Sequence, residues 1–135
     1  MKSPIETVQQ ILKFCQLIIA ILWMYQGLIP KLIFQVTGEQ YVWQQLNVPA
    51  PYIFWIILLS GIAEIIFGSL FLFVTHQYLH WLSIISLIGL FICVLFVYPT
   101  QIYQAFNPFV MNIALGSLSV IALWCISSLH HAKRE

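Results

Sequence analysis

Four long runs of apolar residues, separated by short polar segments, dominate the chain. We predict membrane-spanning helices at about residues 14–34, 52–74, 81–98 and 109–129. Each run is close to the roughly 20 apolar residues that cross a bilayer as a helix. The runs are uniformly apolar, whereas membrane β-strands are short and alternate in polarity. The pattern therefore predicts an all-α integral membrane four-helix bundle, with residues 1–135 forming a single domain.

The first helix is expected to begin before its apolar part. Ser3-Pro4-Ile5-Glu6 is typical of a helix start, because Ser3 can cap, Pro4 suits the first helical position and Glu6 completes a capping box. Pro30 removes a backbone donor near the other end of this helix. We therefore expect a kink near residues 26–27 or a short break.

The polar connector at residues 35–50 is expected to hold a short helix. Thr37-Gly38-Glu39-Gln40 resembles a capping box that opens a helix reaching about Leu46. Tyr41 and Trp43 would then lie where aromatic rings with polar groups prefer to be, at the membrane interface. We predict a short interfacial helix between the first and second spans.

Composition supports the membrane prediction. Hydrophobic residues make up 61% of the chain and charged residues 7%, against about 25% charged in a soluble domain. Lipid must therefore cover most of the outer surface. The net charge of +1 gives no electrostatic case for binding nucleic acid.

The distribution of basic residues predicts the orientation. Lys2, Lys13, Lys133 and Arg134 fall on one side of the predicted membrane, and only Lys31 falls on the other. The side richer in lysine and arginine is normally cytoplasmic. We expect both termini in the cytoplasm.

Glu64 is the most informative single residue, because it lies near the middle of the second span. An ionised acid there costs on the order of 2.5–3.5 kcal/mol. It must therefore face the bundle, either paired or protonated. Ser60, Gly61 and Gly68 lie on the same helix face and would let another helix approach closely. Glu64 is then either a packing residue satisfied by hydrogen bonds or a proton or ligand site.

One face of the first span carries small and polar residues that could pack against residues 60–68 of the second span. Its residues recur at spacings of three and four: Lys13, Gln16, Ala20, Trp23, Gly27 and Lys31. We expect this face to meet residues 60–68, with Gln16 or the indole of Trp23 nearest to Glu64 in depth. Lys13 and Lys31 lie near the ends of the span, where we expect their flexible side chains to anchor at the interface.

Asn112 lies about one turn into the fourth span. With Gln26, Tyr25 and Tyr98 it would form an outer polar pocket, or it would instead make a hydrogen bond between spans. Both interpretations stay open at this point.

The histidines give little support for a metal site. All four map to the cytoplasmic side: His76, His80, His130 and His131. The spacing of His76 and His80 would place both rings on one face of a helix, as a metal requires. No cysteine or acid other than Glu135 lies nearby, so we expect interfacial histidines and no metal. Haem is not expected either, because no histidine is predicted in the apolar core.

No signature of a stand-alone enzyme is present. The cysteines Cys15, Cys93 and Cys125 lie in apolar runs without a Cys-x-x-Cys pair, so we expect small buried side chains and no thiol oxidoreductase. A nucleophile–base pair, a metal triad and a phosphate-binding loop are all missing from the sequence.

Three segments resemble a known family. Residues 23–31, Trp-Met-Tyr-Gln-Gly-Leu-Ile-Pro-Lys, resemble the end of the first span in DoxX-like membrane proteins. Residues 61–68 are similar to that family's Gly-x-x-Glu-x-x-x-Gly in the second span, and residues 107–112 to the start of its last span. The resemblance implies a four-helix bundle of the DoxX type in a bacterial inner membrane.

The resemblance also implies a functional setting. The family is named for a small subunit associated with a terminal quinol oxidase, and some members are linked to membrane oxidoreductase assemblies. Carried over position by position, the site candidates are Gln26, Gly27, Lys31, Glu39 and Glu64. The family gives them no settled catalytic roles. Trp23 and Asn112 join them as candidates from the residue pattern alone.

Three functions remain in competition. The first is an accessory subunit of a membrane redox system, with membrane lipid and redox proteins as partners and a quinone or lipid pocket near Glu64. The second is a small proton-coupled transporter that acts as a homo-oligomer. The third is a structural scaffold without a ligand, in which Glu64 only helps the helices to pack.

Overall fold

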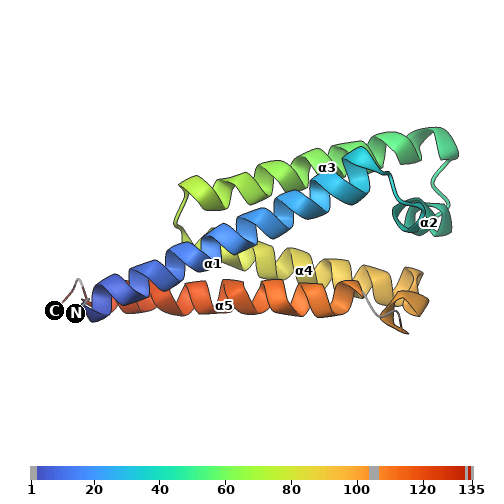
Figure 1. The fold of residues 1–135 in the computed structure, drawn as a ribbon. Helices are drawn as coiled ribbons and strands as arrows, with labels where there is room; N and C mark the ends of the chain where they lie inside the picture. The colour runs from blue at the N-terminus through green and yellow to red at the C-terminus, as the bar shows by residue number, and fades with distance from the viewer. Residues whose placement is uncertain (1–2, 104–106, 133, 135) are drawn as a thin grey trace.

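The computed structural model describes residues 3–103, 107–132 and 134, which form helices and short connections (Figure 1). The elements are α1 (Pro4–Gly27), the π-helix η1 (Leu28–Ile33), α2 (Thr37–Gln45), α3 (Ala50–Phe73), α4 (Gln77–Val97), the 3₁₀ helix η2 (Pro99–Tyr103) and α5 (Pro108–Ala132). Four stretches are long and apolar enough to cross a membrane: Pro4–Ile33, α3, α4 and α5. The predicted all-α four-helix bundle is confirmed, as is the short helix between the first and second spans. Lys2, Lys133 and Glu135 lie outside the described residues.

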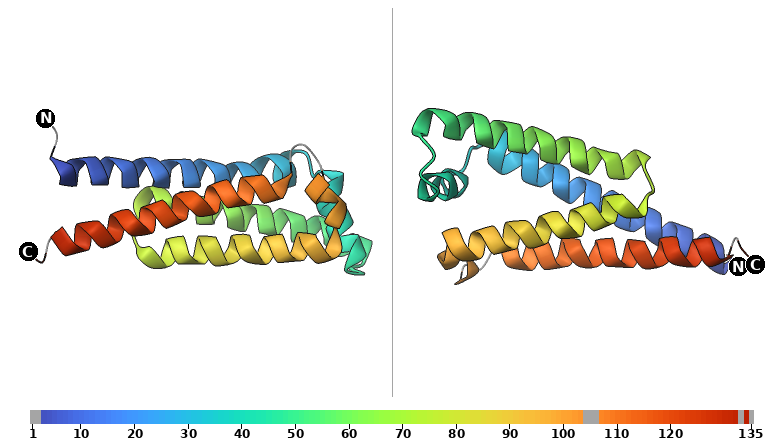
Figure 2. Two further views of the ribbon diagram at one scale, coloured as in Figure 1. Left: turned by 90° about the horizontal axis from the view of Figure 1, so that it is seen from below. Right: turned by 180° about the vertical axis from the view of Figure 1, so that it is seen from behind.

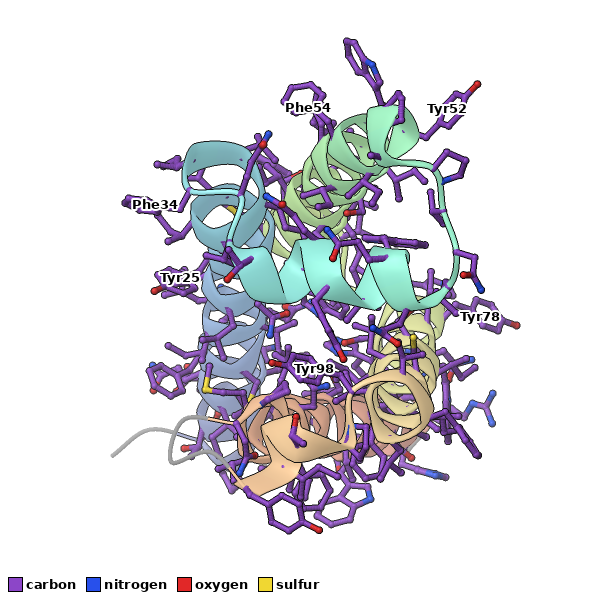
Figure 3. The ribbon with its side chains drawn as sticks, turned by 90° about the vertical axis from the view of Figure 1, so that its right-hand side faces the viewer. Tyr25, Phe34, Tyr52, Phe54, Tyr78 and Tyr98 are labelled. Carbon is purple, nitrogen blue, oxygen red and sulfur yellow. The ribbon has the colours of Figure 1, made fainter. Side chains whose placement is uncertain are left out.

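Helix α1 organises the bundle, because it packs against both α3 and α5, while α4 packs against α5. α3 and α4 are joined by a short hairpin and then diverge (Figure 2). At the far end of the bundle, α2 contacts both of them. Figure 3 shows α2 lying across this end, opposite the two termini.

The predicted capping box at the start of α1 is confirmed. The Glu6 backbone N–H donates to Ser3 Oγ at 3.2 Å, and the Ser3 N–H donates to a carboxylate oxygen of Glu6 at 2.9 Å. The short break that was the alternative to a kink near residues 26–27 is not found. The helix continues as η1, in which the Phe34 N–H bonds the Ile29 carbonyl at 3.1 Å. The wider π turn keeps the chain helical past Pro30, which has no N–H to donate.

The capping box expected for α2 is wrong. Val36 precedes the helix without any side-chain cap, and Thr37 already lies in the first turn. The helix is held by other contacts: the Gln40 amide donates to the Gln35 carbonyl at 2.9 Å, and the ring of Tyr41 lies 4.5 Å from that of Tyr98. These contacts fasten α2 to the end of α4 and to its own connector.

The core consists of two clusters. The central cluster takes residues from all four long helices: Ile19, Ala20, Trp23, Phe71, Leu87 and Leu115. The second joins α1 to α5: Leu12, Cys15, Ala122, Cys125 and Ile126. Cys15 and Cys125 are thus buried small side chains, and Cys93 is half-buried. Large apolar side chains cover the outer faces of the bundle, as contact with lipid requires.

The second cluster lies in a part of the bundle that contains only two helices. The first turns of α1 and the last turns of α5 extend beyond the hairpin between α3 and α4 (Figures 1 and 2). The α1–α5 pair therefore forms the end of the molecule that carries the termini, and α2 closes the other end.

Candidate functional site

The site is built on a close contact between the backbones of α1 and α3. Gly27, Gly61 and Gly68 are all buried there. A Cβ atom on Gly61 would lie 2.8 Å from the Gly27 carbonyl oxygen, and one on Gly68 would lie 2.9 Å from the Ala20 carbonyl oxygen and from the Trp23 Cβ. The expected meeting of the first-span face with residues 60–68 is confirmed. Only glycine, which has no Cβ atom, leaves room for this close contact between α1 and α3.

This contact brings a lysine and a glutamate together inside the bundle. Lys31 Nζ lies 2.5 Å from Glu64 Oε1. The side chains of Lys31 and Glu64 are only 9% and 14% exposed. Our expectation that Lys31 anchors at the interface is therefore wrong. Its side chain turns into the bundle, where the Glu64 carboxylate is its ion-pair partner.

The expectation that Gln16 or Trp23 lies nearest to Glu64 is also wrong. α1 and α3 run antiparallel, so residues early in α1 face residues late in α3. The Gln16 amide donates to the Val74 carbonyl at 3.3 Å and lies 3.2 Å from the Thr75 hydroxyl. The Trp23 indole N–H donates to Ser83 on α4 at 3.1 Å. Lys31, at the far end of the first span, matches the depth of Glu64.

Glu39 brings α2 into the site. One of its carboxylate oxygens lies 3.9 Å from Lys31 Nζ, and its side chain is 34% exposed. The cluster thus combines one ammonium group with two carboxylates. Glu64 Oε2 is buried and has no hydrogen-bond partner in the described part of the chain. The site therefore offers an ammonium donor and an unused carboxylate acceptor side by side.

Four of the seven candidate residues meet here: Gly27, Lys31, Glu39 and Glu64. Asn112 lies elsewhere, in a groove of about 560 Å³ between α4 and α5. The groove is mostly apolar, and the rings of Phe91 and Phe109 stack 4.7 Å apart in its wall.

The outer polar pocket expected around Asn112 does not form as predicted. Tyr25 points away from the bundle, whereas Tyr98 lies under α2 against Tyr41 (Figure 3). Gln26 is half-buried beside Gly27. The helix turn that places Gly27 against α3 directs Tyr25 toward lipid.

The histidines differ from expectation in one important respect. His80 is fully buried, with its ring 5.2 Å from that of Phe71, so it is not an interfacial residue. His76 is exposed and precedes α4, where its Nδ1 accepts from the Tyr78 N–H at 3.4 Å. The two rings therefore do not share a helix face. No group of three metal-ligating side chains occurs among the residues that the structure describes.

His80 could have been recognised from its spacing. It lies three residues before Ser83 and seven before Leu87, so all three share one face of α4. Both of these residues are buried. Its position next to the predicted connection at residues 76–80 points instead to the membrane interface, and the periodicity is the better indicator here.

Comparison with known proteins identifies one relationship. The model of the DoxX-like family matches residues 20–120, which include α2, α3, α4 and about half of each of the other two spans. No curated protein and no solved structure matches the chain.

Proposed function

We propose that this chain, which belongs to the DoxX-like family of multi-pass membrane proteins, is an accessory subunit of a membrane redox system. Its role would be to hold the polar head of a quinone or lipid beside Glu64. The redox setting follows from the family resemblance of its motifs, and the binding role from the geometry at Lys31 and Glu64.

One observation carries the binding role: the buried Glu64 carboxylate uses only one of its two oxygens. Oε1 accepts from Lys31, and Oε2 is buried without a partner among the residues that the structure describes. A buried acceptor left unpaired costs about 1–3 kcal/mol. A ligand hydroxyl that donates to Oε2 would recover this cost.

The Lys31 ammonium gives the site its second recognition element. A carbonyl oxygen accepts a hydrogen bond from an ammonium, and a hydroxyl donates one to a carboxylate. In a quinone–quinol couple the oxidised ring presents carbonyl oxygens and the reduced ring presents hydroxyls, which can accept from the ammonium as well as donate to the carboxylate. The head of a neutral lipid presents a hydroxyl near an ester carbonyl. The shared chemistry is a carbonyl- and hydroxyl-bearing head on an apolar tail, delivered from the bilayer.

The test is native mass spectrometry of the detergent-purified protein with organic extraction of any bound ligand. Glu64→Gln removes the charge of the acceptor, and Glu6→Gln is the matched control because Glu6 is an exposed acid outside the site. We expect wild type and Glu6→Gln to retain a small molecule that Glu64→Gln loses. A redox-dependent ultraviolet spectrum of the extract identifies a quinone, and an ester-bearing mass identifies a lipid.

Equal retention by Glu64→Gln would refute binding at this residue. Apo masses for all three proteins, together with no thermal shift on adding a quinone, would favour the structural scaffold. Proton flux in proteoliposomes that disappears in Glu64→Gln would instead favour a proton-coupled transporter.

We also propose a bacterial inner membrane location with both termini in the cytoplasm. Lys31 is the only lysine or arginine between Lys13 and Lys133, and its charge is paired inside the bundle. Of the other basic residues, Lys13 and Arg134 are described, and both belong to the end that carries the termini. The charge difference between the two ends is therefore larger than a count of lysines and arginines suggests.

A further inference from the structure

A second set of buried polar side chains lies in the half of the bundle nearer to the hairpin. His80, Ser83 and Ser119 are each 0% exposed. Neither ring nitrogen of His80 has a hydrogen-bond partner in the described chain, and neither has Ser119 Oγ. Ionisable residues inside membrane bundles are rare, and they commonly mark ion or proton sites.

These three side chains border the same central cluster. His80 packs against Phe71 of α3, and Ser119 lies one helical turn after Leu115 of α5. Ser83 accepts the indole N–H of Trp23 from α1. Polar groups from α4 and α5 thus face the centre of the bundle beside an aromatic wall.

Polar side chains also lie at the hairpin end of the bundle. Gln16 bonds Thr75 and the Val74 carbonyl at the hairpin, where Thr75 is exposed. Phe67, three residues after Glu64 on α3, packs edge to face against Trp23, with ring centres 5.0 Å apart.

We infer that His80, Ser83 and Ser119 form a hydrated proton-binding site, supplied with water past Gln16 and Thr75. A neutral imidazole has one donor and one acceptor nitrogen, and each hydroxyl both donates and accepts. Water between the ring and Ser119 satisfies all of these groups, as buried water commonly does. A proton delivered by this water leaves an oxygen and binds the free nitrogen of the ring, and no electrons are transferred.

The ring of His80 faces Phe71 from α3, with the Trp23–Ser83 hydrogen bond and Ser119 bordering the same cluster. Among the residues that the structure describes, no charged group acts on the ring. The imidazolium would therefore be stabilised by hydroxyl groups and water alone.

The first experiment measures protonation of the His80 ring directly. In full-length protein in nanodiscs, the exposed histidines His76, His130 and His131 are replaced by glutamine, and the remaining ring is labelled with ¹⁵N. We expect its nitrogen shifts to titrate reversibly as the pH is lowered, and Ser119→Ala to move the titration midpoint. A ring that stays neutral until the protein unfolds would overturn the inference, as would a midpoint unchanged in Ser119→Ala.

The second experiment measures water access with a small, water-soluble methanethiosulfonate reagent. In a background with alanine at the three cysteines, His80→Cys is compared with Leu115→Cys, which replaces an equally buried residue of the same cluster. We expect the reagent to label His80→Cys faster than Leu115→Cys. Adding Gln16→Leu should reduce the labelling rate of His80→Cys to that of Leu115→Cys. Equal labelling of the two positions would overturn the hydrated path. Neither result depends on Glu64, so the quinone or lipid site is tested separately.

Discussion

Lys31 and Glu64 depend on each other, because each is a charge that the interior of a membrane bundle tolerates only when paired. Breaking a buried ion pair by removing one partner typically costs about 3–5 kcal/mol, whereas replacing both partners by apolar residues is often neutral. Because Glu39 lies close by, losing Lys31 is expected to cost more stability than losing Glu64. Without Glu64, Lys31 still has a carboxylate at 3.9 Å, but without Lys31 two carboxylates remain close together with no cation.

We therefore predict that Lys31→Met destabilises the protein more than Glu64→Gln. We expect Lys31→Met to approach the upper part of the range of about 3–5 kcal/mol that is typical of a broken buried pair. The double variant Lys31→Met/Glu64→Leu should recover most of this loss. Chemical unfolding in detergent micelles measures all three. Equal losses of unfolding free energy in the two single variants would show that Glu39 does not stabilise Lys31 when Glu64 is absent.

The sequence indicated the residues of this site but not how they pair. Glu64 is predictable because an acid in the middle of a span must face the bundle, and Lys31 is a candidate through the family resemblance. Their pairing is not predictable, because the register between two antiparallel helices depends on where their backbones touch. The contact between Gly27 and Gly61 sets that register, and the apolar pattern of either helix alone does not contain it. The burial of Lys31 follows from the same contact.

At the scale of the elements, the α1–α3 pair depends on glycine and the outer face of α4 does not. A Cβ on Gly61 would meet backbone and side-chain atoms of the first span, including the Gly27 carbonyl oxygen at 2.8 Å, whereas one on Gly89 would meet nothing within 4 Å. Backbone atoms cannot move aside as the end of a flexible side chain can.

We predict that Gly61→Ala lowers the free energy of unfolding by about 1–3 kcal/mol, as overpacking in a tight core does. Gly89→Ala is the matched control and should be neutral or stabilising, because alanine is the better helix former. Thermal unfolding followed by circular dichroism compares the two. Equal effects of both substitutions would contradict the close contact between α1 and α3.

The helices themselves were largely predictable, and their ends were less so. Long apolar runs are enough to place four spans, and the polar connector with its aromatic residues is enough to place α2. The start of α2 was mispredicted because Thr37 has the chemistry of a cap but lies one position inside the helix. The π turn of η1 was not foreseen, because Pro30 is compatible with a kink, a break or a wider turn.

At the scale of the whole molecule, the two ends carry different charges. With Lys31 paired inside the bundle, the end covered by α2 presents exposed polar side chains such as Gln44, whereas the opposite end presents Lys13 and Arg134. Membrane insertion follows the distribution of lysine and arginine.

We predict that the α2 end faces away from the cytoplasm. In a background without cysteines, Gln44→Cys should react in intact cells with a membrane-impermeant maleimide. Ser128→Cys, near the end of α5, should react only after the membrane is opened. Both positions are exposed in the structure, so the labelling difference reports sidedness. The reverse pattern would show that the termini lie outside.

Because only the α1–α5 pair extends past the hairpin in the described structure, the molecule is narrower at the end that carries the termini. The helical stretch Pro4–Ile33 has 30 residues and α3 has 24, which at 1.5 Å per residue correspond to lengths of about 45 and 36 Å. Among the described residues, α1 and α5 form the end near the termini, whereas four long helices and α2 meet at the other end (Figure 1). A bilayer that covers both ends would be displaced over unequal areas in its two leaflets, and bilayer curvature would then enter the energy of insertion.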